Sequence, residues 1–173
     1  MPTPLSDLLA SLDASPNPAC LLLLEGIEDA QNLGYTLRTA EALGAHGVLL
    51  KKHLWDYDEA ALTRAASGAW DRLPLVKVER DGDTLAELRS RGCALWGCLA
   101  NAKRTVYDID LRGPVILAIG GEKRGLSGAV RAQCEGMLSI PMAGPAGSLA
   151  LSHAAAILLA EVMRQRRVNP NLQ

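Results

Sequence analysis

Short apolar runs alternate with amphipathic segments along most of this chain. Six runs predict strands, and the segments between them have the 3.6-residue periodicity or the capping signals of helices. The predicted strands are 20–26, 46–51, 73–78, 94–99, 115–120 and 137–142, and the predicted helices are 32–44, 58–68, 83–92, 127–134 and 148–167. This β-α-β order with continuously apolar strands predicts the α/β class, with a mostly parallel sheet covered by helices on both faces.

The pattern predicts one domain, at 20–173, preceded by a short N-terminal segment at 1–19. That segment contains one short helical pattern, SDLLASL, and then the proline-rich ASPNP, which is too little for a separate core. The final helix is unusual because Ala154–Ala160 leaves almost no polar stripe over two turns. A helix that is apolar all round is buried on more than one side, so we expect a homodimer.

Composition adds a few limits to this picture. The chain has 173 residues, 49% of them apolar and 21% charged, and it has no phenylalanine. With aromatic residues at only 3%, the stacking platforms of many single-strand RNA binders are not expected. The net charge of −1 does not indicate nucleic-acid binding, although three basic clusters are candidate phosphate contacts or solvated helix ends. These clusters are 51–53, 123–124 and 164–167.

The four cysteines form no CxxC pair and have no histidine at metal-ligand spacing, so we expect free thiols and no metal. The chain opens with no signal-peptide pattern, and no apolar run approaches membrane-spanning length. These observations predict a cytoplasmic protein without a membrane partner.

Three segments carry candidate chemistry, and all three lie at predicted strand-to-helix loops. They are NLGYTLRTA at 32–40, AIGGEKRGLS at 118–127 and IPMAGPAGSLAL at 140–151. Ligands of open α/β sheets bind beyond the carboxyl ends of the strands, so the three loops together predict a pocket lined by backbone. GGEKRG lacks the GK[ST] ending of a phosphate-binding loop and is not GxGxxG, which disfavours a general nucleotide-binding enzyme.

In order and spacing, the three segments resemble the signature motifs of the SpoU/TrmH family of RNA ribose methyltransferases, within the SPOUT superfamily. The likeness runs from about Leu21 to Arg167. It implies a C-terminal deep trefoil knot, which would be an exception to the rule against threaded chains. It also implies a homodimer, an RNA substrate (tRNA or rRNA) and S-adenosyl-L-methionine as methyl donor. The implied cofactor contacts are Ala100, Gly120, Ile140, Met142 and Leu149.

By the same resemblance, Arg38 is the catalytic arginine. A guanidinium stays charged in nearly all settings, so we favour a role in gripping the RNA phosphate and stabilising the developing alkoxide, and leave proton removal open. Asn32 is either a helix N-cap or a substrate-side group, and Glu122 either orients the site or is a solvated turn residue. Ser148 is the cap of the last helix, an active-site hydroxyl, or both.

One position departs from the family pattern. The third motif usually reads Ser-Leu-Asn, and here it reads Ser148-Leu149-Ala150. The missing amide keeps a second reading open, in which a knotted dimer binds RNA or cofactor but is catalytically weak or inactive. The presence of Asn32 and Arg38 favours an active RNA 2′-O-ribose methyltransferase.

Overall fold

The structure, a computed structural model, describes residues 2–51, 58–78, 81–121, 123–145 and 147–167. A seven-stranded sheet with the order β3-β2-β1-β6-β4-β7-β5 forms its centre, and every strand pair in it is parallel. The α/β prediction is therefore confirmed. The strands are β1 (Cys20–Glu25), β2 (Gly47–Lys51), β3 (Leu75–Val78), β4 (Ala94–Cys98), β5 (Arg104–Thr105), β6 (Val115–Gly120) and β7 (Gly136–Ser139).

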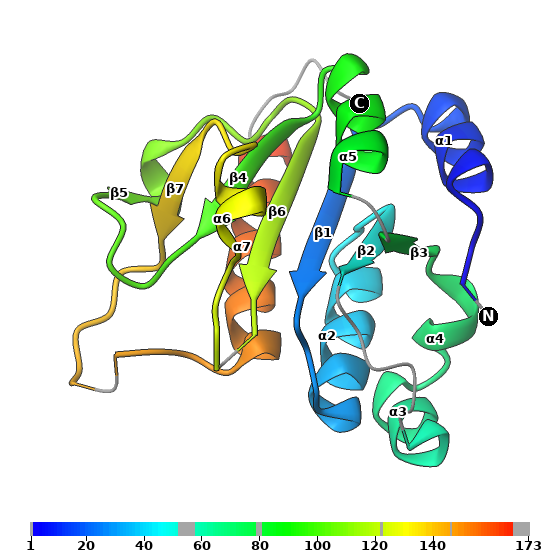
Figure 1. Ribbon diagram of the computed structural model, residues 1–173, viewed down its shortest axis with the longest axis horizontal. Coiled ribbons are helices and arrows are strands. Elements are labelled where there is room, and N and C mark those ends of the chain that lie inside the picture. The colour runs from blue at the N-terminus through cyan, green and yellow to red at the C-terminus, as the bar shows by residue number, and fades with distance from the viewer. Residues whose placement is uncertain (1, 52–57, 79–80, 122, 146, 168–173) are drawn as a thin grey trace.

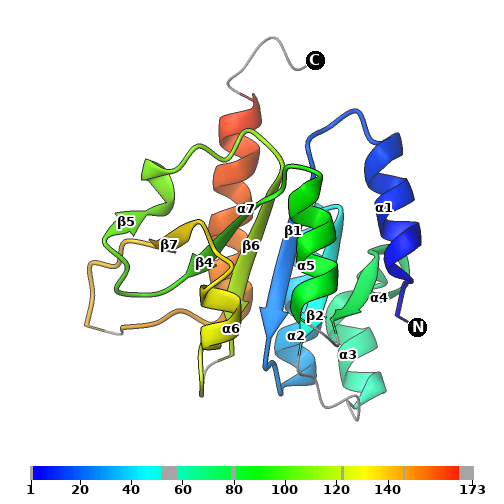
Figure 2. The same cartoon turned by 45° about the horizontal axis from the view of Figure 1, so that its top comes forward.

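Helices cover both faces of the sheet (Figures 1 and 2). On one face, α2 (Ala30–Ala42) and α7 (Leu151–Arg167) pack side by side, and α3 (Glu59–Ala66) and α4 (Ala69–Arg72) contact α2. The other face carries α1 (Leu5–Ala14), α5 (Asp81–Ser90) and α6 (Gly128–Arg131). The N-terminal helix α1 inserts the fully buried Leu8 into this second apolar layer.

Strand β1 contributes side chains to the apolar cores on both faces of the sheet. All six of its residues are buried, as a strand covered on both faces requires. Leu22 and Leu24 belong to the core under α2 and α7, whereas Leu21 and Leu23 belong to the core under α1 and α5. The alternation follows the two-residue period of a strand, so one short leucine run contributes to both cores.

Two of the helix starts that differ from prediction concern candidate site residues. Helix α2 starts at Ala30, and its N-cap is Asp29, whose carboxylate accepts the Asn32 N–H at 2.5 Å. The N-cap reading of Asn32 is therefore wrong. Helix α7 starts at Leu151, and the Ala150 carbonyl accepts the first intrahelical hydrogen bond from Ala154. Ala150 thus has the N-cap position that was predicted for Ser148.

Some elements could not be predicted from the pattern. Strand β5 has only two residues and α4 only four, and a short 3₁₀ turn, η1 (Val106–Asp108), follows β5. Such short elements have too few positions for a periodicity. A long connection leads from β7 to α7 along the lower edge of Figure 1. The trefoil knot that the resemblance implies stays a prediction.

Candidate functional site

The three candidate segments meet at one edge of the sheet. In Figure 1 the arrows of β1, β6 and β7 point to the lower edge, where the loops after β6 and β7 and the start of α2 all lie. In the sheet, β4 lies between β6 and β7. Gly120 ends β6, Ala100 lies in the turn after β4, and Ile140 follows β7 directly. Three of the predicted cofactor contacts therefore come from adjacent strand ends.

The loop at 121–127, which we call the β6–α6 loop, is folded tightly over the end of β1. The Gly121 N–H donates to the Glu25 carbonyl at 2.7 Å, and the Gly125 N–H donates to the Gly121 carbonyl at 2.8 Å. A Cβ at Gly120 would lie 2.1 Å from the Gly125 carbonyl carbon, and one at Gly121 would lie 2.2 Å from the Gly26 oxygen. Both glycines are required by close backbone approach.

A buried ion pair lies beneath this loop. Glu25 and Lys51, the last residues of neighbouring strands, are only 3% and 2% exposed, and their charged groups approach to 2.9 Å. The other Glu25 oxygen accepts the Ser127 N–H at 2.7 Å, and Lys51 Nζ donates to Ser127 Oγ at 3.3 Å. Burial raises the pKa of Glu25, but the hydrogen bonds from Ser127 and Lys51 outweigh it and lower that pKa below its ordinary value.

This pair was missed by the sequence reasoning. Lys51 was considered a candidate phosphate contact, and that reading is wrong because its side chain is buried against Glu25. Its neighbours in the cluster, residues 52–53, lie outside the described residues. The available signal was a charged residue at the last position of two neighbouring, otherwise apolar strands.

Two cavities flank the β6–α6 loop. One, of about 210 Å³, is lined by Asn32, Asp29, Lys123 and the first residue of α7, Leu151. The other, of about 510 Å³, is lined by Glu25, Arg124, Ser127 and the loop glycines. Lys123 pairs with Glu28 across this edge, and that hydrogen bond lowers the pKa of the Glu28 carboxyl. Asn32 therefore reaches the same cavity as the second and third segments.

The loop from 141 to 150 exposes most of its length, including Ser148 and Leu149, while Ile140 and Met142 are half-buried. Leu149 is 39% exposed. Among the described residues, no amide or carbonyl of 141–149 forms a hydrogen bond to the backbone elsewhere. This loop therefore presents small or apolar side chains, together with backbone groups that no described backbone hydrogen bond occupies.

Arg38 lies apart from these cavities. It is on the exposed face of α2, two turns beyond Asn32, and lines neither cavity at this edge. Among the described residues, it forms no hydrogen bond or ion pair. The glycine of the same segment, Gly34, has a packing role, because a Cβ there would lie 2.6 Å from Ala65 Cβ in α3. Glu122, the remaining predicted site residue, lies outside the described residues.

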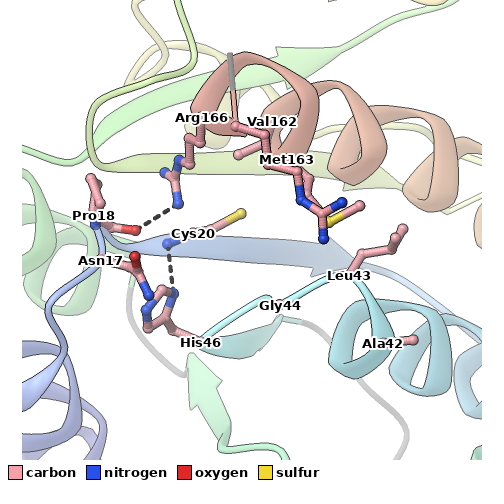
Figure 3. A pocket seen from close by; sticks show the side chains of 11 residues that line it. Asn17, Pro18, Cys20, Ala42, Leu43, Gly44, His46, Val162, Met163 and Arg166 are labelled. Atoms are coloured by element: carbon pink, nitrogen blue, oxygen red, sulfur yellow. Dashed lines mark hydrogen bonds between the residues drawn. The ribbon is translucent and has the colours of Figure 1, made fainter. Parts of the chain in front are cut away.

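A larger cavity, of about 760 Å³, lies at the opposite end of the sheet, where β1 begins (Figure 3). It is bounded by the C-terminal ends of α2 and α7. Arg166 points across it and donates to the carbonyls of Pro18, Ala19 and Gly113 at 2.7, 2.9 and 2.9 Å. This arginine was a candidate phosphate contact, but its guanidinium is already used to hold the segments that precede β1 and β6.

His46 is a further polar group of that cavity. Its Nδ1 accepts the Cys20 N–H at 3.1 Å, and its Nε2 lies 2.9 Å from Ser15 Oγ. Burial and the nearby Arg166 charge lower the pKa of His46 below its ordinary value. A neutral ring with Nδ1 as acceptor donates from Nε2 to Ser15, so His46 also serves to fasten the N-terminal segment.

Comparisons with known proteins identify the family of this chain. The sequence profile of the SpoU rRNA Methylase family matches residues 19–160. The chain belongs to this family. The resemblance inferred from the three segments is thereby confirmed.

Named relatives share this match over nearly the whole chain. An uncharacterized tRNA/rRNA methyltransferase of Mycobacterium sp. strain KMS is 40% identical over 93% of this chain and 51% of its own length. The 23S rRNA (guanosine-2'-O-)-methyltransferase RlmB of Ralstonia nicotianae is 38% identical over 92% of this chain and 64% of its own length. The chain thus spans about half to two thirds of the length of these relatives.

A solved structure shows the same fold with a bound cofactor. The SpoU methyltransferase AviRb from Streptomyces viridochromogenes, in complex with AdoMet (S-adenosylmethionine), superimposes with a TM-score of 0.80. It is 34% identical, and the match covers 87% of this chain and 59% of that one.

The described residues contain no group of three or more His, Cys, Asp or Glu side chains placed to hold a metal ion. Within the described helices, none is long and apolar enough to cross a membrane.

Proposed function

We propose that this chain transfers the methyl group of S-adenosylmethionine to a ribose 2′-hydroxyl of tRNA or rRNA. The observation that carries the proposal is the convergence of the three family segments on one edge of the sheet, with Asn32, the β6–α6 loop and Leu151 around one cavity. The relatives named as RNA methyltransferases, and the AdoMet-bound relative, support the same chemistry.

The residues present fit the proposed cofactor. A bound S-adenosylmethionine supplies an already activated methyl group on a positively charged sulfur. Backbone carbonyls and small side chains suit that charge, and the loop after β7 offers carbonyls that no other described backbone group uses. We expect the backbone at Gly120 and Ile140, the side chains of Met142 and Leu149, and the turn at Ala100 to hold it.

Arg38 is proposed to bind an RNA phosphate and to stabilise the negative charge that develops on the ribose oxygen. Its exposure and the absence of a described ion partner leave the guanidinium available for this role. Charge stabilisation requires no change in its protonation, unlike proton abstraction, which a guanidinium resists.

Asn32 is proposed to act on the substrate side, because Asp29 already provides the cap of α2. Ser148 is proposed as an active-site hydroxyl, since it is exposed and three residues ahead of α7. Glu122 stays a candidate orienting group.

The homodimer is part of the proposal. One side of α7 packs on the sheet, but the opposite side presents apolar residues, with Ala160 exposed and Ala156, Ile157 and Met163 half-buried. A second copy of the chain packed on this strip would bury it.

Light scattering at micromolar concentration measures the mass of the chain in solution and so tests the dimer. We expect a dimer, which Ala160→Glu converts to monomer, and a wild-type monomer would contradict this part.

A methyl-transfer assay tests the activity. Labelled S-adenosylmethionine is incubated with the purified chain and bulk unmethylated RNA, and the product is hydrolysed with alkali. We expect label in alkali-resistant dinucleotides, since 2′-O-methylation blocks cleavage at that position. Binding of the donor without incorporation would instead support the alternative, a catalytically weak knotted dimer, which the missing amide at Ala150 favours. An active chain would be expected in the cytoplasm, with its RNA.

A further inference from the structure

The buried pair of Glu25 and Lys51 has no assigned role. Replacing buried ion pairs with apolar residues is often neutral or stabilising, so such a pair is weak support for a purely stabilising role. The surrounding residues, Leu23 and Leu49 on the same face of β1 and β2, would accommodate apolar side chains. What the pair contacts is therefore more informative than the pair itself.

Glu25 holds both ends of the β6–α6 loop. Its carbonyl accepts the N–H of the first loop residue, Gly121, at 2.7 Å, and its carboxylate accepts the N–H of the last, Ser127, at 2.7 Å. Lys51 balances the carboxylate and also reaches Ser127 Oγ. The loop begins directly after Gly120 and forms a wall of both cavities at this edge.

We propose that the Glu25–Lys51 pair is a positioning device, which holds the β6–α6 loop in place over the end of β1 and so sets the affinity for S-adenosylmethionine. The inference rests on the proposed function, because the loop matters for the cofactor only if the backbone at Gly120 binds it. An unfastened loop would have to be ordered during binding, and the entropy lost in that step weakens affinity.

Two double variants separate positioning from stability. E25M/K51M removes both charges and the acceptor for the Ser127 N–H, whereas E25Q/K51M removes both charges but keeps an amide oxygen as acceptor. We expect similar melting temperatures for the two. By calorimetry, S-adenosylhomocysteine should bind about 10-fold more weakly to E25M/K51M, which corresponds to the loss of one hydrogen bond at the upper end of the usual range.

Kinetics and hydrogen exchange give a second readout. In E25M/K51M, KM for S-adenosylmethionine should rise about 10-fold while kcat at saturation changes less than about 3-fold, the signature of lost ground-state binding. The amide of Ser127 should lose protection from exchange, while amides of β1 and β6 keep theirs. Equal affinity of the two double variants would overturn the inference.

A second pair of variants decides the question if E25M/K51M does not fold. Ser127 has φ −65°, the value that proline enforces, so S127P removes the N–H with little change in backbone angle. S127A keeps the N–H and removes only the hydroxyl. S127P should bind S-adenosylhomocysteine about 10-fold more weakly than S127A, and equal binding refutes the proposal. A wild-type chain that binds none of it would refute the proposed function itself, and this inference with it.

Discussion

The backbone groups at the two ends of the central sheet are used in opposite ways. At the amino end, Arg166 crosses a cavity of about 760 Å³ and its two terminal nitrogens donate to three backbone carbonyls. At the carboxyl end, the cavities are smaller, about 210 and 510 Å³, and the nearby loop at 141–149 has backbone groups that no described backbone partner uses. We therefore place the proposed site at the carboxyl end, where ligands of open α/β sheets bind, although the larger cavity lies at the amino end.

The largest expected effect would come from Arg38. Arg38→Ala should lower the methyl-transfer rate about 10²–10³-fold, as the loss of one charge-stabilising donor typically does. The melting temperature should stay the same, because the side chain is exposed. Initial rates with labelled donor and a thermal melt check both parts.

Arg64→Ala, on the exposed side of α3, is the matched control and should keep normal rates. Turnover of Arg38→Ala within a few-fold of the wild type would remove Arg38 from the proposed site.

A substitution at the amino end of the sheet should lower stability and leave cofactor binding unchanged. Arg166→Met leaves three carbonyls without their charged donor, so we expect the free energy of unfolding to fall by about 2–4 kcal/mol. The folded fraction should bind S-adenosylhomocysteine normally. Urea unfolding and calorimetry measure the two quantities, and Arg167→Met, at an exposed position, should change stability by less than about 0.5 kcal/mol. A binding defect in Arg166→Met would make the amino-end cavity part of the site.

Acid should lower the free energy of unfolding by protonating Glu25 at the carboxyl end of the sheet. Its pKa in the folded chain is below the ordinary value of 4.5, so its charge stabilises the fold above that pH. The stabilisation should be lost as pH falls from 4.5 through the lowered folded pKa. Urea unfolding across this range should show a steeper loss for the wild type than for E25Q/K51M. Parallel curves would mean that Glu25 is no better stabilised in the folded chain than in the unfolded one.

The smallest effect should come from Ala150. This residue has the N-cap position of α7, where asparagine is among the best residues and alanine among the poorest. Ala150→Asn should therefore raise the free energy of unfolding by about 1 kcal/mol. Ser148→Asn, two residues earlier, should bring no such gain. Thermal melts of the two variants decide this, and equal melting temperatures would contradict the N-cap assignment.

Much of the fold could be predicted because its signals are local. The leucine run of β1, the apolar face of α2 and the glycines at loop ends follow from residue type and spacing alone. The same local pattern identified the family through the segments at 32–40, 118–127 and 140–151, and the profile match confirms that identification.

The partners of charged groups depended on tertiary structure, whereas the cap of α2 did not. Asp29 rather than Asn32 caps α2 because its carboxylate accepts the Asn32 N–H three residues on, a local signal that the prediction overlooked. Arg166 is fixed by carbonyls more than 50 positions away in the chain. No window of sequence contains both partners of such a contact.

The sequence by itself determined the parallel α/β class and the family, and it predicted the edge of the sheet where we propose the site, because these depend on periodicity and on glycine-rich loops. Only the tertiary structure decided that Lys51 is buried against Glu25, and that Arg38 is exposed and without a described partner. The physical reason is that the sequence names a lysine or arginine but not its surroundings. Its role is decided by which acceptors the fold brings within hydrogen-bonding distance.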